Sequence, residues 1–140
     1  MGLYFRAGMK RFKNIISLAF LLFMSSAYAE DSRVFFIKPS NGDVVDKTFE
    51  VVFGISGMKL APAGTYDNGT GHHHLIIDAS LPDLSMPVPA TKQYLHFGKA
   101  QDRTMITLEP GKHKLQMILG DGNHIPHNPP IYSEIIEIEV

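Results

Sequence analysis

The chain has 140 residues, among them 13 Lys or Arg and 14 Asp or Glu, which gives a formal net charge of −1. It contains no cysteine, which excludes disulfides, thiolate metal sites and cysteine nucleophiles. The charge balance provides no basic face, so nucleic acid is not an expected partner.

The N-terminal segment has the features of a secretory signal peptide. A basic stretch is followed by an apolar run over residues 15–24, and Ala27 and Ala29 then form an A-x-A cleavage pattern. The run is too short to span a bilayer. We therefore predict a signal peptide over residues 1–29 and one periplasmic or secreted domain over residues 30–140, with no stable membrane insertion after cleavage. The remaining domain is net acidic, because the leader carries four basic residues and no acidic one.

Short apolar stretches separated by turn signals run through the rest of the chain. Several alternate apolar and polar residues with period two, as in a half-buried strand, and no stretch keeps a helical period. Turn-forming residues, such as the Asn41–Gly42 and Pro110–Gly111 pairs, interrupt these stretches. The sequence predicts seven strands, at residues 33–38, 47–56, 72–78, 93–98, 102–108, 113–120 and 133–140.

Seven short strands in a domain of this size predict an all-β fold, an immunoglobulin-like antiparallel β-sandwich. In such a sandwich the connection between the second and third strands lies at the same end as the connection between the sixth and seventh. In the last strand, alternation places Ile136 and Ile138 inward and Ser133 outward.

Six of the seven histidines fall at this shared end, and five of them could act together. The segment GHHHL begins the third strand, where His72 and His74 share one face and His73 shares the opposite face with Leu75. The other histidines that the predicted topology brings to this end are His96, His124 and His127.

The chemistry of these histidines suggests a metal site. Neutral imidazole is a good ligand for zinc and Cu(II), and two histidines at i and i+2 of a strand project to the same side. We predict that the domain binds a divalent transition metal, copper or zinc. His113 starts the sixth strand at the opposite end and is left out. The predicted metal residues are His72, His74, His96, His124 and His127, with Asp121 as a further ligand or as a partner that orients a ligand histidine.

Two other interpretations remain. The loop over residues 119–130 is dense in turn formers, so its histidines could hydrogen-bond to carbonyls and close the sandwich end without an ion. The domain would then be a non-catalytic interaction module of the cell envelope, and its partner an envelope protein. An enzyme is not expected, because no serine lies in a G-x-S-x-G elbow and no phosphate-binding glycine loop is present.

Several segments resemble a bacterial family of small exported proteins whose domain has no assigned function. They are GHHHLIID, LHFGKAQ, PGKHKLQMILGDGNHIPHNPP and SEIIEIEV, and the resemblance extends over residues 33–140. The GHHHL and LGDxNHxPHxPP motifs are its most specific parts. The resemblance implies export and a sandwich-like fold, and it brings no activity with it.

Overall fold

The structure is a computed structural model that describes residue 2 and residues 31–140. The predicted signal peptide therefore lies outside the described residues, Gly2 aside. Within the described part of the chain, no helix has the length and apolar character needed to cross a membrane.

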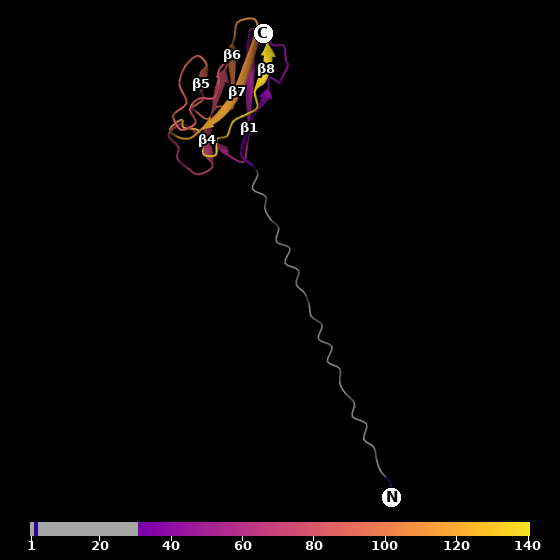
Figure 1. Cartoon of the computed structure of the whole chain (residues 1–140), viewed down its shortest axis with the longest axis vertical. Coiled ribbons are helices and arrows are strands. Elements are labelled where there is room, and N and C mark those ends of the chain that lie inside the picture. The colour runs from indigo at the N-terminus through magenta and orange to yellow at the C-terminus, as the bar shows by residue number, and fades with distance from the viewer. Residues whose placement is uncertain (1, 3–30) are drawn as a thin grey trace.

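The described residues form an all-β sandwich of two sheets (Figure 1). The three-stranded sheet has the order β1-β2-β6, with β1 at Arg33–Lys38, β2 at Thr48–Ser56 and β6 at Arg103–Thr107. The second sheet has the order β3-β4-β7-β8, and β5 also pairs with β4. Its strands are β3 (Lys59–Leu60), β4 (Thr70–Ile77), β5 (Tyr94–His96), β7 (Lys112–Gly120) and β8 (Ile136–Glu139).

This division of strands confirms the predicted immunoglobulin-like arrangement. The first, second and fifth predicted strands form one sheet, and the third, fourth, sixth and seventh form the other. Strand β3 was not predicted. It pairs in parallel with β4 through only two residues, Lys59 and Leu60, at the start of a Pro- and Gly-rich loop. A two-residue strand has no periodicity that a sequence could reveal.

The main core fills the space between the sheets. Val51 and Phe53 of β2 meet Leu75 of β4 and Leu115 and Met117 of β7, and all of these side chains are buried. The period-two pattern of each strand selects these residues, because alternate side chains point to the same face. Each such burial contributes about 1.5–3 kcal/mol of hydrophobic free energy.

The last strand is shorter than expected. Ile136 and Ile138 are buried as predicted, but the strand begins at Ile136, and the prediction of an outward Ser133 was wrong. The Ser133 hydroxyl oxygen accepts a hydrogen bond from the Met117 N–H at 2.9 Å, and the hydroxyl donates to the Glu134 carbonyl at 2.7 Å. Ser133 is therefore buried because it pairs with the backbone of β7 before regular strand geometry starts.

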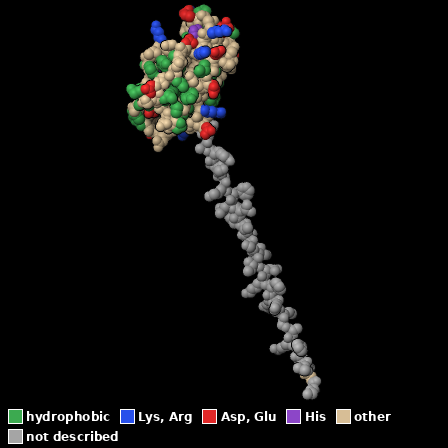
Figure 2. All heavy atoms as spheres, viewed as in Figure 1, with side chains coloured by type: hydrophobic (Ala, Val, Ile, Leu, Met, Phe, Trp, Pro, Cys, Tyr) green, Lys and Arg blue, Asp and Glu red, His purple; other side chains and the backbone are tan. Residues whose placement is uncertain are grey.

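A second apolar cluster covers the outer face of the β4–β7 pair. Ile76 of β4 and Ile118 of β7 pack there with Val88, which lies in the long connection between β4 and β5. As a result, β4 is buried on both faces from Gly71 to Ile77. Figure 2 shows histidine contributing only a small patch on the face in view, while hydrophobic side chains gather across its middle.

At the far end of β4, Asp78 and His113 form a pair remote from the other histidines. The Nδ1 of His113 lies 2.6 Å from the Asp78 carboxylate, and its Nε2 lies 2.7 Å from the Glu109 carbonyl. Both ring nitrogens therefore face acceptors, an arrangement that a protonated imidazole satisfies. The hydrogen bond that the His113 ring donates to the Asp78 carboxylate is the main reason that the pKa of His113 is raised. This position of His113, at the opposite end of β4 from the other histidines, agrees with its exclusion from the predicted metal residues.

The raised pKa of His113 predicts how its contribution to stability depends on pH. The pair stabilises the fold fully below the unfolded pKa of about 6.5 and loses this effect as pH rises through the folded pKa. We expect the difference in unfolding free energy between the wild type and His113→Gln to shrink as pH rises from 5.5 to 8.5. Urea denaturation measures it, and a difference that is independent of pH would contradict the assignment.

Candidate metal centre

Strand β4 fixes two of the candidate ligands. His72 and His74 lie on its outer face and are both fully buried, and His73 points into the core, where its ring is 5.0 Å from that of Phe53. The predicted division of the triplet between the two faces is confirmed. The β4–β7 ladder pairs His72 with Gly120 and His74 with Ile118, so both side chains lie beside the end of β7.

The third candidate, His124, is positioned by the turn that follows β7. The carboxylate of Asp121 accepts hydrogen bonds from the N–H groups of Asn123 at 2.8 Å and Ile125 at 3.0 Å. The Asp121 carbonyl also accepts the His124 N–H at 2.9 Å. This tight turn places His124 at a φ of 64°, a left-handed conformation that costs free energy for a residue with a Cβ. Such strain often marks a functional position.

Two further segments hold this turn in place. The Val88 N–H donates to the His124 carbonyl at 2.8 Å, so the β4–β5 connection is tied to the histidine itself. On the other side, the Gly64 N–H donates to the Gly122 carbonyl at 2.9 Å, and the Tyr66 hydroxyl donates to the Asn123 side chain at 2.9 Å. His124 is thus fixed by contacts from segments far apart in the sequence.

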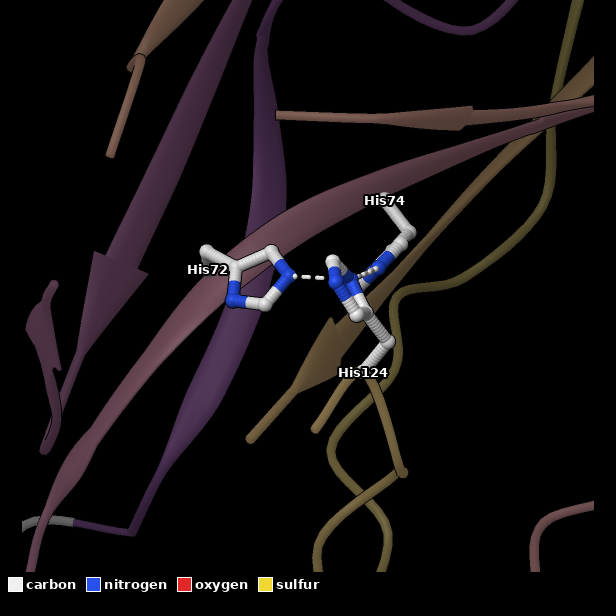
Figure 3. Close-up of side chains that lie close together, drawn as sticks. All are labelled: His72, His74 and His124. Atoms are coloured by element: carbon white, nitrogen blue, oxygen red, sulfur yellow. Dashed lines mark hydrogen bonds between the residues drawn. The ribbon is translucent and has the colours of Figure 1, made fainter. Parts of the chain in front are cut away.

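The three rings converge on one point (Figure 3). The Nε2 of His72 lies 2.9 Å from the Nδ1 of His124, and the Nε2 of His74 lies 3.4 Å from that same atom. One ligand nitrogen from each ring lies within 4.8 Å of the other two. We call these three residues the histidine trio. They form a group that could hold a metal ion.

A glycine makes room for the trio. A Cβ on Gly120 would collide with Cε1 of His74 and would lie 3.0 Å from its Nδ1 and 3.3 Å from the Cα of His124. Gly120 therefore lets the His74 ring lie against the end of β7. Gly120 is not among the predicted site residues, although a glycine at a strand end beside a histidine cluster is the signal that marks it.

Burial keeps the trio neutral. Desolvation, followed by the charges of neighbouring histidines, lowers the pKa of His72 to about 4 and that of His74 to about 2. Desolvation and His96 also lower the pKa of His124. The trio is therefore deprotonated at neutral pH, which is the form of imidazole that binds a metal.

A single two-centre hydrogen bond pairs only two of the three facing nitrogens. A single proton can join the Nε2 of His72 to the Nδ1 of His124 across 2.9 Å, because one such bond needs one donor and one acceptor. The Nε2 of His74, in a fully buried side chain, then faces an atom that is already occupied. A cation bound at the centre would instead accept three lone pairs at once.

The other predicted metal residues surround the trio without joining it. His96 lies beside it, with its ring centroid 4.4 Å from that of His74, and its Nε2 lies 2.8 Å from the Pro89 carbonyl. His127 directs its Nε2 to the Thr70 carbonyl at 2.9 Å. The carboxylate of Asp121 caps the turn, as described above. The structure thus brings the ring nitrogens of three of the six predicted residues together as candidate ligands.

The fold and the trio define the class of this protein as a small β-sandwich with a buried histidine cluster at one end. The chain belongs to the family described as DUF4399, a domain of unknown function, whose profile matches residues 51–140. The match begins within β2 and includes all seven histidines. No curated protein and no solved structure gives a significant match to the chain.

The close contact at Gly120 predicts that a single methyl group disturbs the trio. Gly120→Ala should displace the His74 ring and destabilise the fold by about 1–3 kcal/mol, the usual cost of overpacking. Gly98→Ala is the control, because a Cβ there would come no closer than 3.3 Å to Ala63 and 4.0 Å to His124. Chemical denaturation and the NMR signals of the ring protons measure the effects. Equal behaviour of the two variants would contradict this role of Gly120.

The lowered pKa values predict acid lability. Burial lowers the pKa of His73 to about 4, as it does for His72. Between about pH 6.5 and pH 4 the unfolded chain binds protons that the folded protein does not, so stability falls as pH falls. In the presence of a chelator, His73→Leu should reduce this slope by up to about 1.4 kcal/mol per pH unit. Denaturation curves from pH 4 to 7 test this, and unchanged slopes would count against a neutral buried His73.

Proposed function

We propose that this domain is a small, non-catalytic binding protein for a divalent transition metal, copper or zinc, in the periplasm or outside the cell. The observation that carries the proposal is the convergence of three neutral, desolvated imidazole nitrogens from His72, His74 and His124. The signal-like leader supports an extracytoplasmic location, where such a domain would sequester or deliver its metal.

The spacing of the trio suits a transition metal. Metal–nitrogen bonds of about 2.0–2.1 Å at tetrahedral angles place neighbouring ligand nitrogens about 3.3 Å apart. The two measured separations to the Nδ1 of His124, 2.9 and 3.4 Å, lie on either side of this value. All three ligand nitrogens lie within 4.8 Å of one another, so ring movements bring them to the spacing of a bound ion.

The donor set favours the same metals. Imidazole is a preferred ligand of zinc and copper, whereas calcium and magnesium prefer oxygen ligands. A non-catalytic role is supported because both carboxylates that could act as a general base are already engaged in hydrogen bonds. Asp121 already accepts two backbone N–H groups, and Asp78 is bound to His113 at the opposite end of β4.

One observation favours a second candidate, the interaction module in which the histidines are structural. The 2.9 Å contact between His72 and His124 has the length of a hydrogen bond, and His96 and His127 both face backbone carbonyls. In this alternative the cluster locks the end of the sandwich, and the surrounding loops recognise an envelope protein.

Isothermal titration with Zn(II) and Cu(II) separates the two functions. The protein must be free of any polyhistidine tag, which would itself bind metal. We expect one ion per chain in the wild type, and loss of this binding in the His72→Ala/His74→Ala variant, because it retains only one ligand of the trio.

His113→Ala is the matched control, since His113 lies at the other end of the sheet and should leave binding unchanged. A wild type that binds neither ion, together with a less stable double variant, would contradict metal binding and support the structural lock.

A further inference from the structure

His96 lies on the same face of the sheet as the trio. In the β4–β5 ladder it is the direct partner of His74, and directly paired residues project to the same side. Its ring centroid is 4.4 Å from that of His74 and 4.8 Å from that of His124. Four imidazoles therefore form one contiguous cluster, in which His72 and His74 are fully buried and His96 and His124 are partly exposed, His96 on a short strand.

The hydrogen bond of the His96 ring determines which of its two nitrogens carries the lone pair that can bind a metal. A carbonyl oxygen can only accept, so the Nε2 at 2.8 Å from the Pro89 carbonyl carries the proton. The Nδ1 of neutral His96 consequently carries the lone pair. Histidines that bind metals commonly donate their other N–H to a backbone carbonyl, which fixes the tautomer and the orientation of the ring.

We infer that His96 is the fourth ligand of the proposed metal site and closes it through Nδ1, an inference that rests on the proposed function. His72 and His74 form the buried floor of the site, His124 borders it from the turn after β7, and His96 covers the ion from the side of β5. The site is then an all-imidazole, four-coordinate centre rather than a three-coordinate one with an open position. Such closure suits storage or transfer of an ion better than catalysis, which needs an open position.

The location of His96 makes it the part of the site that can move. His72 and His74 are fully buried in a strand that pairs along both edges, whereas β5 has three residues and pairs only with β4. A small rotation of His96 is therefore less costly than any movement of the floor. Metal would enter and leave past His96, and binding would tie β5 and the connection that contains Pro89 to β4.

His127 provides a matched control within the same chain. Its Nε2 also faces a backbone carbonyl, that of Thr70, so its Nδ1 is likewise the unprotonated nitrogen. Its ring, however, packs against Gly71, on the side of the trio away from β5. The inference assigns ligation to His96 and not to His127, although both have the same tautomer.

The test compares His96→Gln with His127→Gln by Cu(II) titration and by electron paramagnetic resonance of the Cu(II) complex. Glutamine keeps an N–H donor near the original Nε2 and lacks the imidazole lone pair. We expect His96→Gln to weaken Cu(II) binding at least tenfold and to change the copper hyperfine pattern, because one nitrogen ligand is lost. His127→Gln should leave both readouts within twofold of the wild type. Circular dichroism confirms that each variant is folded.

The outcomes distinguish this inference from the function on which it rests. If the wild type binds Cu(II) and His96→Gln matches it in affinity and spectrum, His96 is not a ligand and the proposed function stands. If His127→Gln alone changes the spectrum, the fourth ligand is His127 and the inference is overturned. If the wild type binds neither Cu(II) nor Zn(II), the proposed function fails, and the inference fails with it.

Discussion

Burial of β4 on both faces is the constraint on which the rest of the structure depends. Its inner face joins the core between the sheets, and on its outer face Ile76 packs with Val88 from the β4–β5 connection. A strand covered in this way shields the side chains at its polar end from solvent. His72 and His74 lie there fully buried, so each of their ring nitrogens that lacks a partner in the protein or in a bound ion costs free energy.

The same desolvation favours a transition metal ion over a proton at this site. A proton on one ring places a charge in a dry environment beside other imidazoles, which is why the pKa of His74 is lowered to about 2. A transition metal ion forms direct bonds to several rings at once, and these bonds offset the cost of its own desolvation. A hard ion such as calcium gains too little from nitrogen ligands. Burial therefore disfavours the competitors of a transition metal more than the metal itself.

The sequence alone predicted the features of the site that depend on the alternation of side chains along a strand and on the order of the strands. Period two placed His72 and His74 opposite His73, and the sandwich topology brought His124 and His96 to the same end as these two. What sequence did not predict depends on irregular segments. The covering of the outer face by Val88 and the capping turn of Asp121 arise from single hydrogen bonds and packing contacts, which have no period. The three candidate ligands that face one another could therefore be distinguished from the other predicted residues only with coordinates.

The residues of the cluster come from three regions of the chain that are distant in sequence. His72 and His74 belong to β4, His96 to β5 and His124 to the turn after β7, so the site exists only in the folded domain. An ion that binds only the folded state stabilises it by mass action. In a domain without cysteine, such an ion would connect β4 to β5 and to the turn after β7, as a disulfide connects distant segments in many secreted proteins. Under the proposed function, metal binding and the stability of this end of the sandwich are thus thermodynamically coupled.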